Sequence, residues 1–356
     1  MSLSSIDRRR FGAIAACLPL AGLGAGTARA IAPPVSPPFS QGVHGRVRVA
    51  VAGAGLLYHL PLTIAQQLGF FRAEGLEVSL QDYTGGALAL RALLQGEADV
   101  CSGAYDHTLR AQLQGLPCTA FVLQVRAPQL ALAASARAWP VRSVPRFKGL
   151  RVGVTAPGSS SHMVARMALS QGGASLEDID FIGVGMGQSA LSALRQGRVH
   201  ALCHADPIVS LLEQRGEVRL LSDTRTLKGS QELFGGTMPG ASLYAPRAFV
   251  QHQAATSQAL ANAMVHALKW LQTASAADLM RVVPQDYLMG DRGTYLAAFH
   301  KVRDTFSPDG LMPDDGPATA LRTLARLQPE QASAKVDLGR TFTNEFARKA
   351  KTKFNA

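Results

Sequence analysis

The chain has 356 residues, and 36 Lys plus Arg against 25 Asp plus Glu give it a formal net charge of +11. Apolar residues make up 47% of it and charged residues 17%, a balance that fits a packed globular protein and excludes general disorder. Four cysteines are too few for a disulfide scaffold at this size, and the length favours two lobes or domains over one small core.

Residues 1–30 are predicted to be a twin-arginine-type export signal. Three arginines at 8–10 precede an uncharged stretch over 11–26, and residues 28–30 offer an A-x-A cleavage site. We therefore expect a periplasmic protein, cleaved near Ala30. Cys17 ends a segment that resembles a lipoprotein box, but cleavage there would leave too short a hydrophobic region.

Residues 31–45 are rich in proline and predict a flexible linker. Removal of residues 1–30 takes away four arginines and one aspartate, so 32 cations face 24 anions and the net charge falls to +8. These cations are scattered along the chain. A nucleic-acid-binding protein concentrates them in a stripe with interleaved aromatic residues, so no nucleic-acid partner is expected.

Strand and helix patterns alternate from residue 46 onward. Residues 46–52 alternate like a strand, and apolar residues at four- and three-residue spacing over 60–71 predict a helix with Pro61 in its first turn. A strand over 77–80, a helix after Gly85-Gly86 and a strand from Asp99 follow. This order is typical of a parallel α/β unit.

The same order restarts in the middle of the chain. Strands are predicted over 150–154, 181–184 and 199–203, with helices after 157–161 and over 189–197, and the C-terminal third looks helical. Two α/β units in succession predict two lobes. We place lobe 1 at 46–127 and 240–356, and lobe 2 at 128–239.

Several motifs in sequence order resemble one family of transport proteins. They lie at 58–71, 74–78, 85–86, 94–99 and 147–160. This part of the chain resembles the periplasmic solute-binding proteins of the nitrate, sulfonate and taurine ABC importers (NitT/TauT, NMT1-like), and the resemblance covers most of residues 46–275. It implies an α/β, two-lobed type II periplasmic binding protein with a hinged cleft, a small-molecule ligand, ABC permease membrane subunits as partners and a monomer. A related pyrimidine-synthesising fungal branch carries a cysteine-rich motif that is absent here.

Candidate ligand-binding residues of lobe 1 follow its predicted strands. Tyr58 and His59 follow the first strand and suit stacking or hydrogen bonding, although His59 equally fits a helix start in solvent. The remaining candidates are Gly85, Gly86, Ser102, Tyr105 and Asp106. The two glycines allow close backbone approach to a ligand or simply make a turn, and the polar cluster either lines the cleft or caps a helix.

Candidates in lobe 2 also lie where strands end. Ser159, Ser160 and Ser161 stand at a predicted helix N-terminus, where unpaired N–H groups and the helix dipole attract an anion; plain N-capping is the alternative. His204 and Asp206 end another strand. His200 shares a face with His204, but too few ligands converge there for zinc, so no metal site is expected.

Three cysteines follow the predicted export signal, and the common sequence motifs of enzymes do not occur. One pair among Cys101, Cys118 and Cys203 could form a disulfide, or all three could be buried thiols. Gly53-Ala54-Gly55 lacks the third glycine of a dinucleotide fingerprint, and no nucleophile elbow, Walker loop or H-E-x-x-H occurs. We therefore expect no catalytic residues and no cofactor.

The sequence as a whole predicts an importer component that captures a small organic anion, a sulfonate or an aromatic carboxylate, and delivers it to a permease. A pyrimidine (thiamine precursor) binding protein, a periplasmic sensor and an enzyme on the same fold remain the alternatives.

Overall fold

A computed structural model describes residues 45–137, 149–328 and 336–356. The described residues all belong to one compact unit, residues 38–356, which is distinct from residues 1–37. The predicted export signal and residues 31–44 of the predicted linker lie outside the described residues. Gly45, which we assigned to the linker, is instead the first residue of strand β1.

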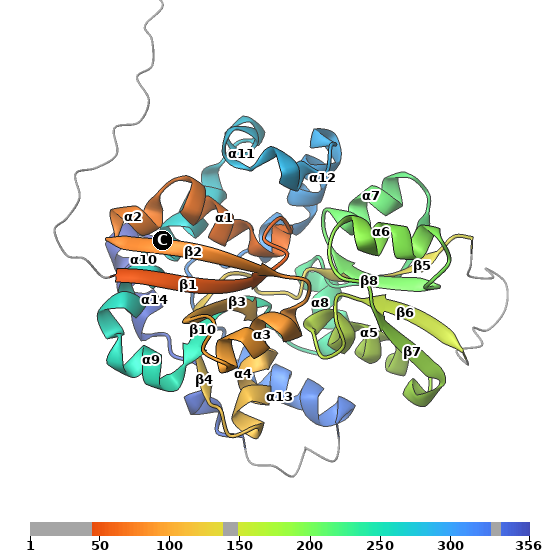
Figure 1. Cartoon of the computed structure of the whole chain (residues 1–356), viewed down its shortest axis with the longest axis horizontal. Helices are drawn as coiled ribbons and strands as arrows, with labels where there is room; N and C mark the ends of the chain where they lie inside the picture. Colours follow the sequence, from red (N-terminus) through yellow and green to blue (C-terminus); the bar gives the residue numbers. More distant parts are fainter. Residues whose placement is uncertain (1–44, 138–148, 329–335) are drawn as a thin grey trace, which may run out of the picture. The chain divides into compact units, whose positions relative to one another are not determined.

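The first sheet has five strands in the order β2-β1-β3-β10-β4 (Figure 1). Their bounds are Gly45–Ala52 (β1), Leu76–Tyr83 (β2), Val100–Ala104 (β3), Cys118–Leu123 (β4) and Ala241–Pro246 (β10). Strand β1 pairs in parallel with β2 and β3, whereas β10 runs antiparallel to β3 and β4. The helices between these strands are α1 (Leu60–Gln67), α2 (Phe70–Ala73), α3 (Gly86–Leu94) and α4 (Asp106–Leu113). We call this sheet and its helices lobe 1.

The second sheet repeats this plan in the order β7-β6-β8-β5-β9. Its strands are β5 (Leu130–Ser135), β6 (Leu150–Val154), β7 (Ile179–Gly183), β8 (Ala201–Ala205) and β9 (Val218–Asp223). Strand β6 is parallel to β7 and β8, and β5 is antiparallel to β8 and β9. Helices α5 (Ser160–Gln171), α6 (Gln188–Arg195), α7 (Ile208–Gln214) and α8 (Leu227–Phe234) complete lobe 2.

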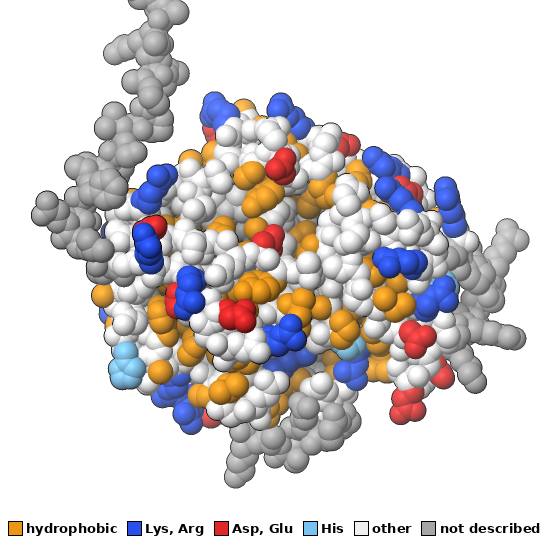
Figure 2. Space-filling model, in the orientation of Figure 1, with side chains coloured by type: hydrophobic (Ala, Val, Ile, Leu, Met, Phe, Trp, Pro, Cys, Tyr) orange, Lys and Arg blue, Asp and Glu red, His pale blue; other side chains and the backbone are white. Residues whose placement is uncertain are grey.

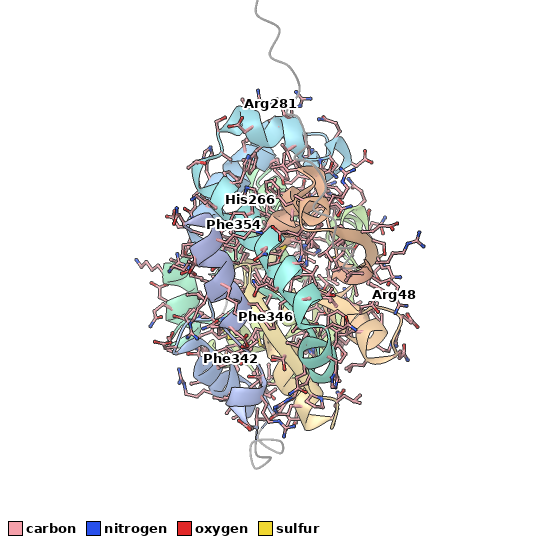
Figure 3. All side chains as sticks on the ribbon, turned by 90° about the vertical axis from the view of Figure 1, so that its left-hand side faces the viewer. Arg48, His266, Arg281, Phe342, Phe346 and Phe354 are labelled. Atoms are coloured by element: carbon pink, nitrogen blue, oxygen red, sulfur yellow. The ribbon has the colours of Figure 1, made fainter. Side chains whose placement is uncertain are left out.

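The remaining chain is helical. It forms α9 (Arg247–His252), α10 (Ala254–Thr273), α11 (Ala276–Val282), α12 (Arg292–Val302), α13 (Gly316–Leu327) and α14 (Glu345–Phe354). Helices α10 and α14 pack on each other and on β4. At the end of α14, the ring of Phe354 stacks on His266 (Figure 3). His266 stacks in turn on Phe70. Leu260, Met264 and Leu268 on the buried face of α10 belong to the hydrophobic core.

The chain passes between the sheets after β4 and again before β10. The two crossing segments are hydrogen-bonded to each other, because the amide of Gly240 donates to the carbonyl of Val125 at 3.0 Å. A third segment lies beside them, where the amide of Arg126 donates to the carbonyl of Thr305 at 2.7 Å. A Cβ at Gly240 would lie only 2.3 Å from the carbonyl oxygen of Ala127, so the crossing requires a residue without a side chain.

The α/β fold predicted from the sequence is confirmed. Four strands were not predicted, and three of them share one property that the fourth, β9, lacks. Strands β4, β5 and β10 are buried over nearly their whole lengths and therefore lack the alternation of apolar and polar residues on which the prediction relied. Strands β10 and β5 run antiparallel to β3 and β8 of the parallel sets, and β4 runs antiparallel to β10. Both sheets are consequently mixed.

The open alternatives for the cysteines are settled for the described chain, since Cys101, Cys118 and Cys203 are all free and buried. Among the residues described, no group of three or more His, Cys, Asp or Glu side chains is arranged to hold a metal ion. None of the described helices combines the length and the apolarity that crossing a bilayer requires.

Candidate functional site

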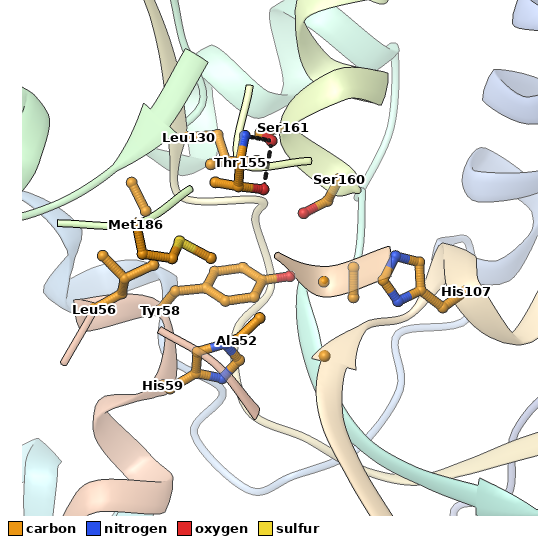
Figure 4. Close-up of a pocket in the computed structure, with 14 residues that line it drawn as sticks. Ala52, Leu56, Tyr58, His59, His107, Leu130, Thr155, Ser160, Ser161 and Met186 are labelled. Carbon is orange, nitrogen blue, oxygen red and sulfur yellow. Dashed lines mark hydrogen bonds between the residues drawn. The ribbon is translucent and has the colours of Figure 1, made fainter. Parts of the chain in front are cut away.

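A small cavity lies between the two lobes, at the carboxyl ends of parallel strands from both sheets (Figure 4). Ala52 and Ala104 end β1 and β3, Thr155 follows β6, and Ala205 ends β8; all four line the cavity. Ligands of α/β proteins bind at such strand ends. The remaining lining residues are Leu56, Tyr58, His59, Gly86, Gly103 and His107 from lobe 1, and Leu130, Ser160, Ser161 and Met186 from lobe 2.

Tyr58 contributes an unsatisfied hydroxyl to this cavity. Its side chain is only 6% exposed, and its hydroxyl oxygen has no hydrogen-bond partner. Figure 4 shows the phenol ring crossing the cavity toward the side where Ser160 lies. Burial, reinforced by the negative charge of Asp106, raises the pKa of Tyr58 well above its usual value, and a smaller interaction with the Ser160 hydroxyl opposes this shift. The hydroxyl therefore stays protonated and can donate a hydrogen bond to a ligand.

Two buried histidines border the same space and are both neutral. The Nδ1 atom of His59 lies 3.0 Å from the hydroxyl of Ser102, and burial lowers the pKa of His59 to about 3. The Nδ1 atom of His107 lies 3.0 Å from the hydroxyl of Tyr244, and burial lowers its pKa to about 4. The Nε2 atom of His107 has no partner. It is a second polar atom that a ligand could satisfy.

The serine turn, residues 157–161, places the N-terminus of α5 at the cavity. Ser159 precedes the helix, and its hydroxyl accepts from the amide of Ala87 in lobe 1 at 3.0 Å. The hydroxyl of Ser161 accepts from the amide of Thr155 at 3.0 Å and so fixes the turn from within lobe 2. Ser160 and Ser161 both line the cavity, and Figure 4 shows the Ser160 side chain directed toward the hydroxyl of Tyr58. A helix N-terminus also leaves its first N–H groups without partners inside the helix.

The glycines act mainly by allowing the lobes to approach each other. A Cβ at Gly85 would lie 2.6 Å from the Cβ of Ala156 in lobe 2, so any larger residue would push the lobes apart. Gly86 lines the cavity beside His107.

Seven of the predicted site residues do not line the cavity. They are Gly85 and Ser159, whose contacts are given above, and Ser102, Tyr105, Asp106, His204 and Asp206. Ser102 is buried between His59 and Gln124, whose amide nitrogen donates to its hydroxyl at 2.8 Å. The hydroxyl of Tyr105 lies 2.6 Å from that of Thr341.

The charged members of this group have partners elsewhere. Asp106 forms an ion pair with Arg110 at 3.1 Å, and Asp206 accepts from the amide of Ser210 at 2.8 Å and pairs with the buried Arg225 at 3.2 Å. His204 is buried, and its Nδ1 atom accepts from the amide of Ala205 at 3.0 Å. Both carboxylates therefore support the walls of the cavity without facing it.

The apolar wall was not predicted from the sequence, and His107 was left out of the candidate residues although it belongs to the polar cluster at 102–107. Leu56, Leu130 and Met186 face the cavity from three different loops or strand starts, and no single stretch of sequence connects them. His107 lies at the carboxyl end of β3, the same kind of position that drew attention to Tyr105 and Asp106. Position at a strand end could therefore have identified His107, whereas the apolar wall has no comparable signal.

The lining defines the kind of ligand that the cavity can hold. Every described residue that lines it is uncharged at neutral pH, and most of its surface is apolar. Polar atoms converge from Tyr58, His107 and the N-terminus of α5. Figure 2 shows the charged side chains dispersed over the face it presents, with Lys and Arg interspersed among Asp and Glu.

This arrangement, with a cavity between two α/β lobes joined by crossing segments, defines the fold class of the periplasmic solute-binding proteins. Residues 57–274 match the family described as NMT1/THI5 like. The chain belongs to this family, which confirms the resemblance seen in the sequence.

Individual relatives show how far the likeness extends. A solved structure of a protein from Bordetella bronchiseptica RB50 is 47% identical, with a TM-score of 0.86, and the match covers 89% of this chain and 100% of that one. The alkanesulfonate-binding protein SsuA from Xanthomonas axonopodis pv. citri, bound to MOPS, is 19% identical with a TM-score of 0.66 over 84% and 98% of the two chains. At this identity the likeness shows the fold alone.

A third relative is an enzyme, but its match is short. The 4-amino-5-hydroxymethyl-2-methylpyrimidine phosphate synthase of Schizosaccharomyces pombe is 36% identical over 64 residues. The match spans only 18% of either chain.

Proposed function

We propose that this chain is the solute-binding protein of an ABC importer, which captures a small organic monoanion, a sulfonate or an aromatic carboxylate, between its lobes. The cavity at the strand ends of both lobes supports this proposal most directly, because it offers neutral donors inside an apolar wall. Delivery to a permease in the membrane and export to the periplasm, with cleavage near Ala30, belong to the same proposal.

The absence of charge from the described lining argues for a single negative charge on the ligand. Helix N–H groups and hydroxyls compensate one delocalised charge well, because each contributes a partial charge and a directed hydrogen bond. Burying a second charge without a cationic partner costs several kcal/mol, on the order of the whole binding energy of a weak ligand. Sulfate and phosphate monoesters are therefore poor candidates.

Tyr58, Ser160 and His107 are the residues that we propose to contact the anionic head. The apolar body of the ligand would then lie against Leu56, Leu130 and Met186. With the lobes in this arrangement, the space open to the centre of a water molecule is about 30 Å³, room for a water or two but not for an aromatic ring. Binding must therefore be coupled to opening of the lobes for entry and to movement of lining side chains such as that of Tyr58, whose ring crosses the cavity (Figure 4).

A calorimetric and thermal-shift screen of residues 31–356 tests the proposal. The probes are benzenesulfonate, methanesulfonate, benzoate, sulfate and an aminopyrimidine. A monoanion at about 100 times its Kd should stabilise the fold by about 2.7 kcal/mol, whereas sulfate should not. Tyr58→Phe should weaken binding about threefold to tenfold, the effect of one lost hydrogen bond, and His252→Gln on the exposed face of α9 should not.

Other results of this screen would overturn the proposal. Binding of sulfate as tight as that of benzenesulfonate would contradict the selection by charge. A response to the aminopyrimidine alone would favour a pyrimidine-binding protein, and chemical conversion of a bound probe would favour an enzyme.

A further inference from the structure

An arginine outside the cavity connects the two lobes behind the serine turn. Arg110 lies on α4 of lobe 1, and its Nη1 atom donates to the carbonyl oxygen of Gly158 in lobe 2 at 3.0 Å. Its Nε atom lies 3.1 Å from Oδ2 of Asp106, one helical turn earlier. The side chain of Arg110 is 18% exposed and that of Asp106 is 2% exposed. The contact between the lobes is thus largely shielded from solvent.

Gly158 is held from both sides. Its amide donates to Nδ1 of His162 at 3.0 Å, while its carbonyl accepts from Arg110. The residue has a φ of +83°, a left-handed conformation that glycine adopts without strain. Ser159, the next residue, accepts from Ala87 of lobe 1. Two lobe 1 donors therefore determine where the turn before α5 lies.

Asp106 has no role in the lining of the cavity, and its two carboxylate oxygens have no hydrogen-bond partner. A buried carboxylate without hydrogen bonds is costly, and its ion pair with Arg110 is the interaction that offsets this cost. The pair in turn restricts a long side chain that otherwise has many rotamers. Asp106 thereby keeps the guanidinium of Arg110 directed at Gly158.

We propose that Arg110 is a positioning residue for ligand capture, directed by Asp106: the pair holds the serine turn of lobe 2 against lobe 1 and so stabilises the closed arrangement around the ligand. The inference rests on the proposed function. Arg110 does not line the cavity, so it acts through the carbonyl of Gly158, and separation of the lobes breaks this bond. The bond lowers the rate of ligand release rather than raising the rate of capture.

Four variants test the inference. Arg110→Met keeps the apolar stem and removes the donors, Arg110→Lys keeps a charge and one donor, and Asp106→Asn keeps the volume and removes the ion pair. Arg91→Met, at an exposed position of the neighbouring α3, is the matched control. The affinity and release rate of benzenesulfonate are measured for each, together with small-angle scattering of the ligand-free chain.

The expected result separates positioning from simple attraction of an anion. Arg110→Met should release benzenesulfonate about tenfold faster with an unchanged capture rate, Arg110→Lys should recover part of this loss, and Arg91→Met should behave like the parent. Asp106→Asn should also weaken binding. If Arg110 acted only through its charge, removing the negative charge of Asp106 would tighten binding, and that outcome would overturn the inference.

Scattering distinguishes failure of the inference from failure of the proposed function. If no probe anion binds the parent chain, the ligand-free Arg110→Met protein should still show a larger radius of gyration than the parent and than Arg91→Met. Equal radii for the three proteins would show that the contact does not hold the lobes together, whatever the ligand is.

Discussion

Acid should destabilise this protein well before its carboxylates titrate, because His59 and His107 are buried in their neutral forms. Burial lowers the pKa of His59 to about 3 and that of His107 to about 4, against an ordinary value of 6.5. Between about pH 4 and pH 6.5, the unfolded chain binds a proton at each of the two histidines and the folded chain does not. The free energy of unfolding must therefore fall as the pH drops from 6.5 toward 4.

The magnitude follows from the same values. A histidine that is protonated only in the unfolded state lowers the free energy of unfolding by about 1.9 kcal/mol between pH 7 and pH 5. His59 and His107 together should cost about 4 kcal/mol, a large part of the roughly 5 to 15 kcal/mol that stabilises a typical domain.

Urea denaturation at pH 7 and pH 5 measures this loss. In His107→Gln the loss over this interval should be smaller than in the parent by about 1.9 kcal/mol, whatever the variant's stability at pH 7. His252→Gln, at an exposed position of α9, controls for the removal of a histidine as such. An undiminished loss in His107→Gln would refute the assignment of a neutral, buried His107.

Three further substitutions, the first of them with a matched control, test other parts of the fold by chemical denaturation. Gly240→Ala should destabilise the protein by about 2 kcal/mol or more, because its Cβ would overlap the carbonyl of Ala127. Its control is Gly293→Ala at an exposed position of α12, where the nearest atom to a Cβ is an oxygen of Asp291 at 3.4 Å, and this change should stabilise the protein by about 0.5 kcal/mol. Equal effects of the two substitutions would contradict the tight packing at the crossing. Ser275→Ala should cost about 1 kcal/mol, because it removes the capping box at the start of α11, and no change would show that this cap contributes nothing. Arg225→Met should cost about 3 to 5 kcal/mol, because it leaves buried and half-buried carboxylates without their cation; a neutral result would mean that they find another.

The sequence predicted those elements whose pattern is local. The parallel strands at 46–52 and 150–154 each begin a strand–helix unit, and their periodicity, with glycine and proline between them, was sufficient to predict an α/β chain of two units. The serine turn was also recognisable, because Ser159 stands between a strand and a helix. Local signals are sufficient here because each depends only on neighbours a few residues away.

The long-range arrangement was decided by the tertiary structure. β10 returns to lobe 1 more than 110 residues after β4 and pairs with it, and no local pattern encodes such a pairing. Asp106 looked like a ligand-binding residue because it follows a strand, yet its partner is Arg110, and that partner's second contact is with Gly158 in the other lobe. Whether a polar side chain faces a cavity or another side chain depends on which surfaces pack together.

The candidate site also combines features that local sequence patterns predict with features that only the tertiary structure decides. Strand ends and a helix N-terminus drew attention to Tyr58 and Ser160 in the sequence, and the structure brings both to one cavity. Residue type could not reveal that His59 and His107 are neutral, because their charge is set by burial in the folded chain. The sequence determined which residues stand where strands end; only the packing of two lobes decided which of them share an apolar, uncharged space.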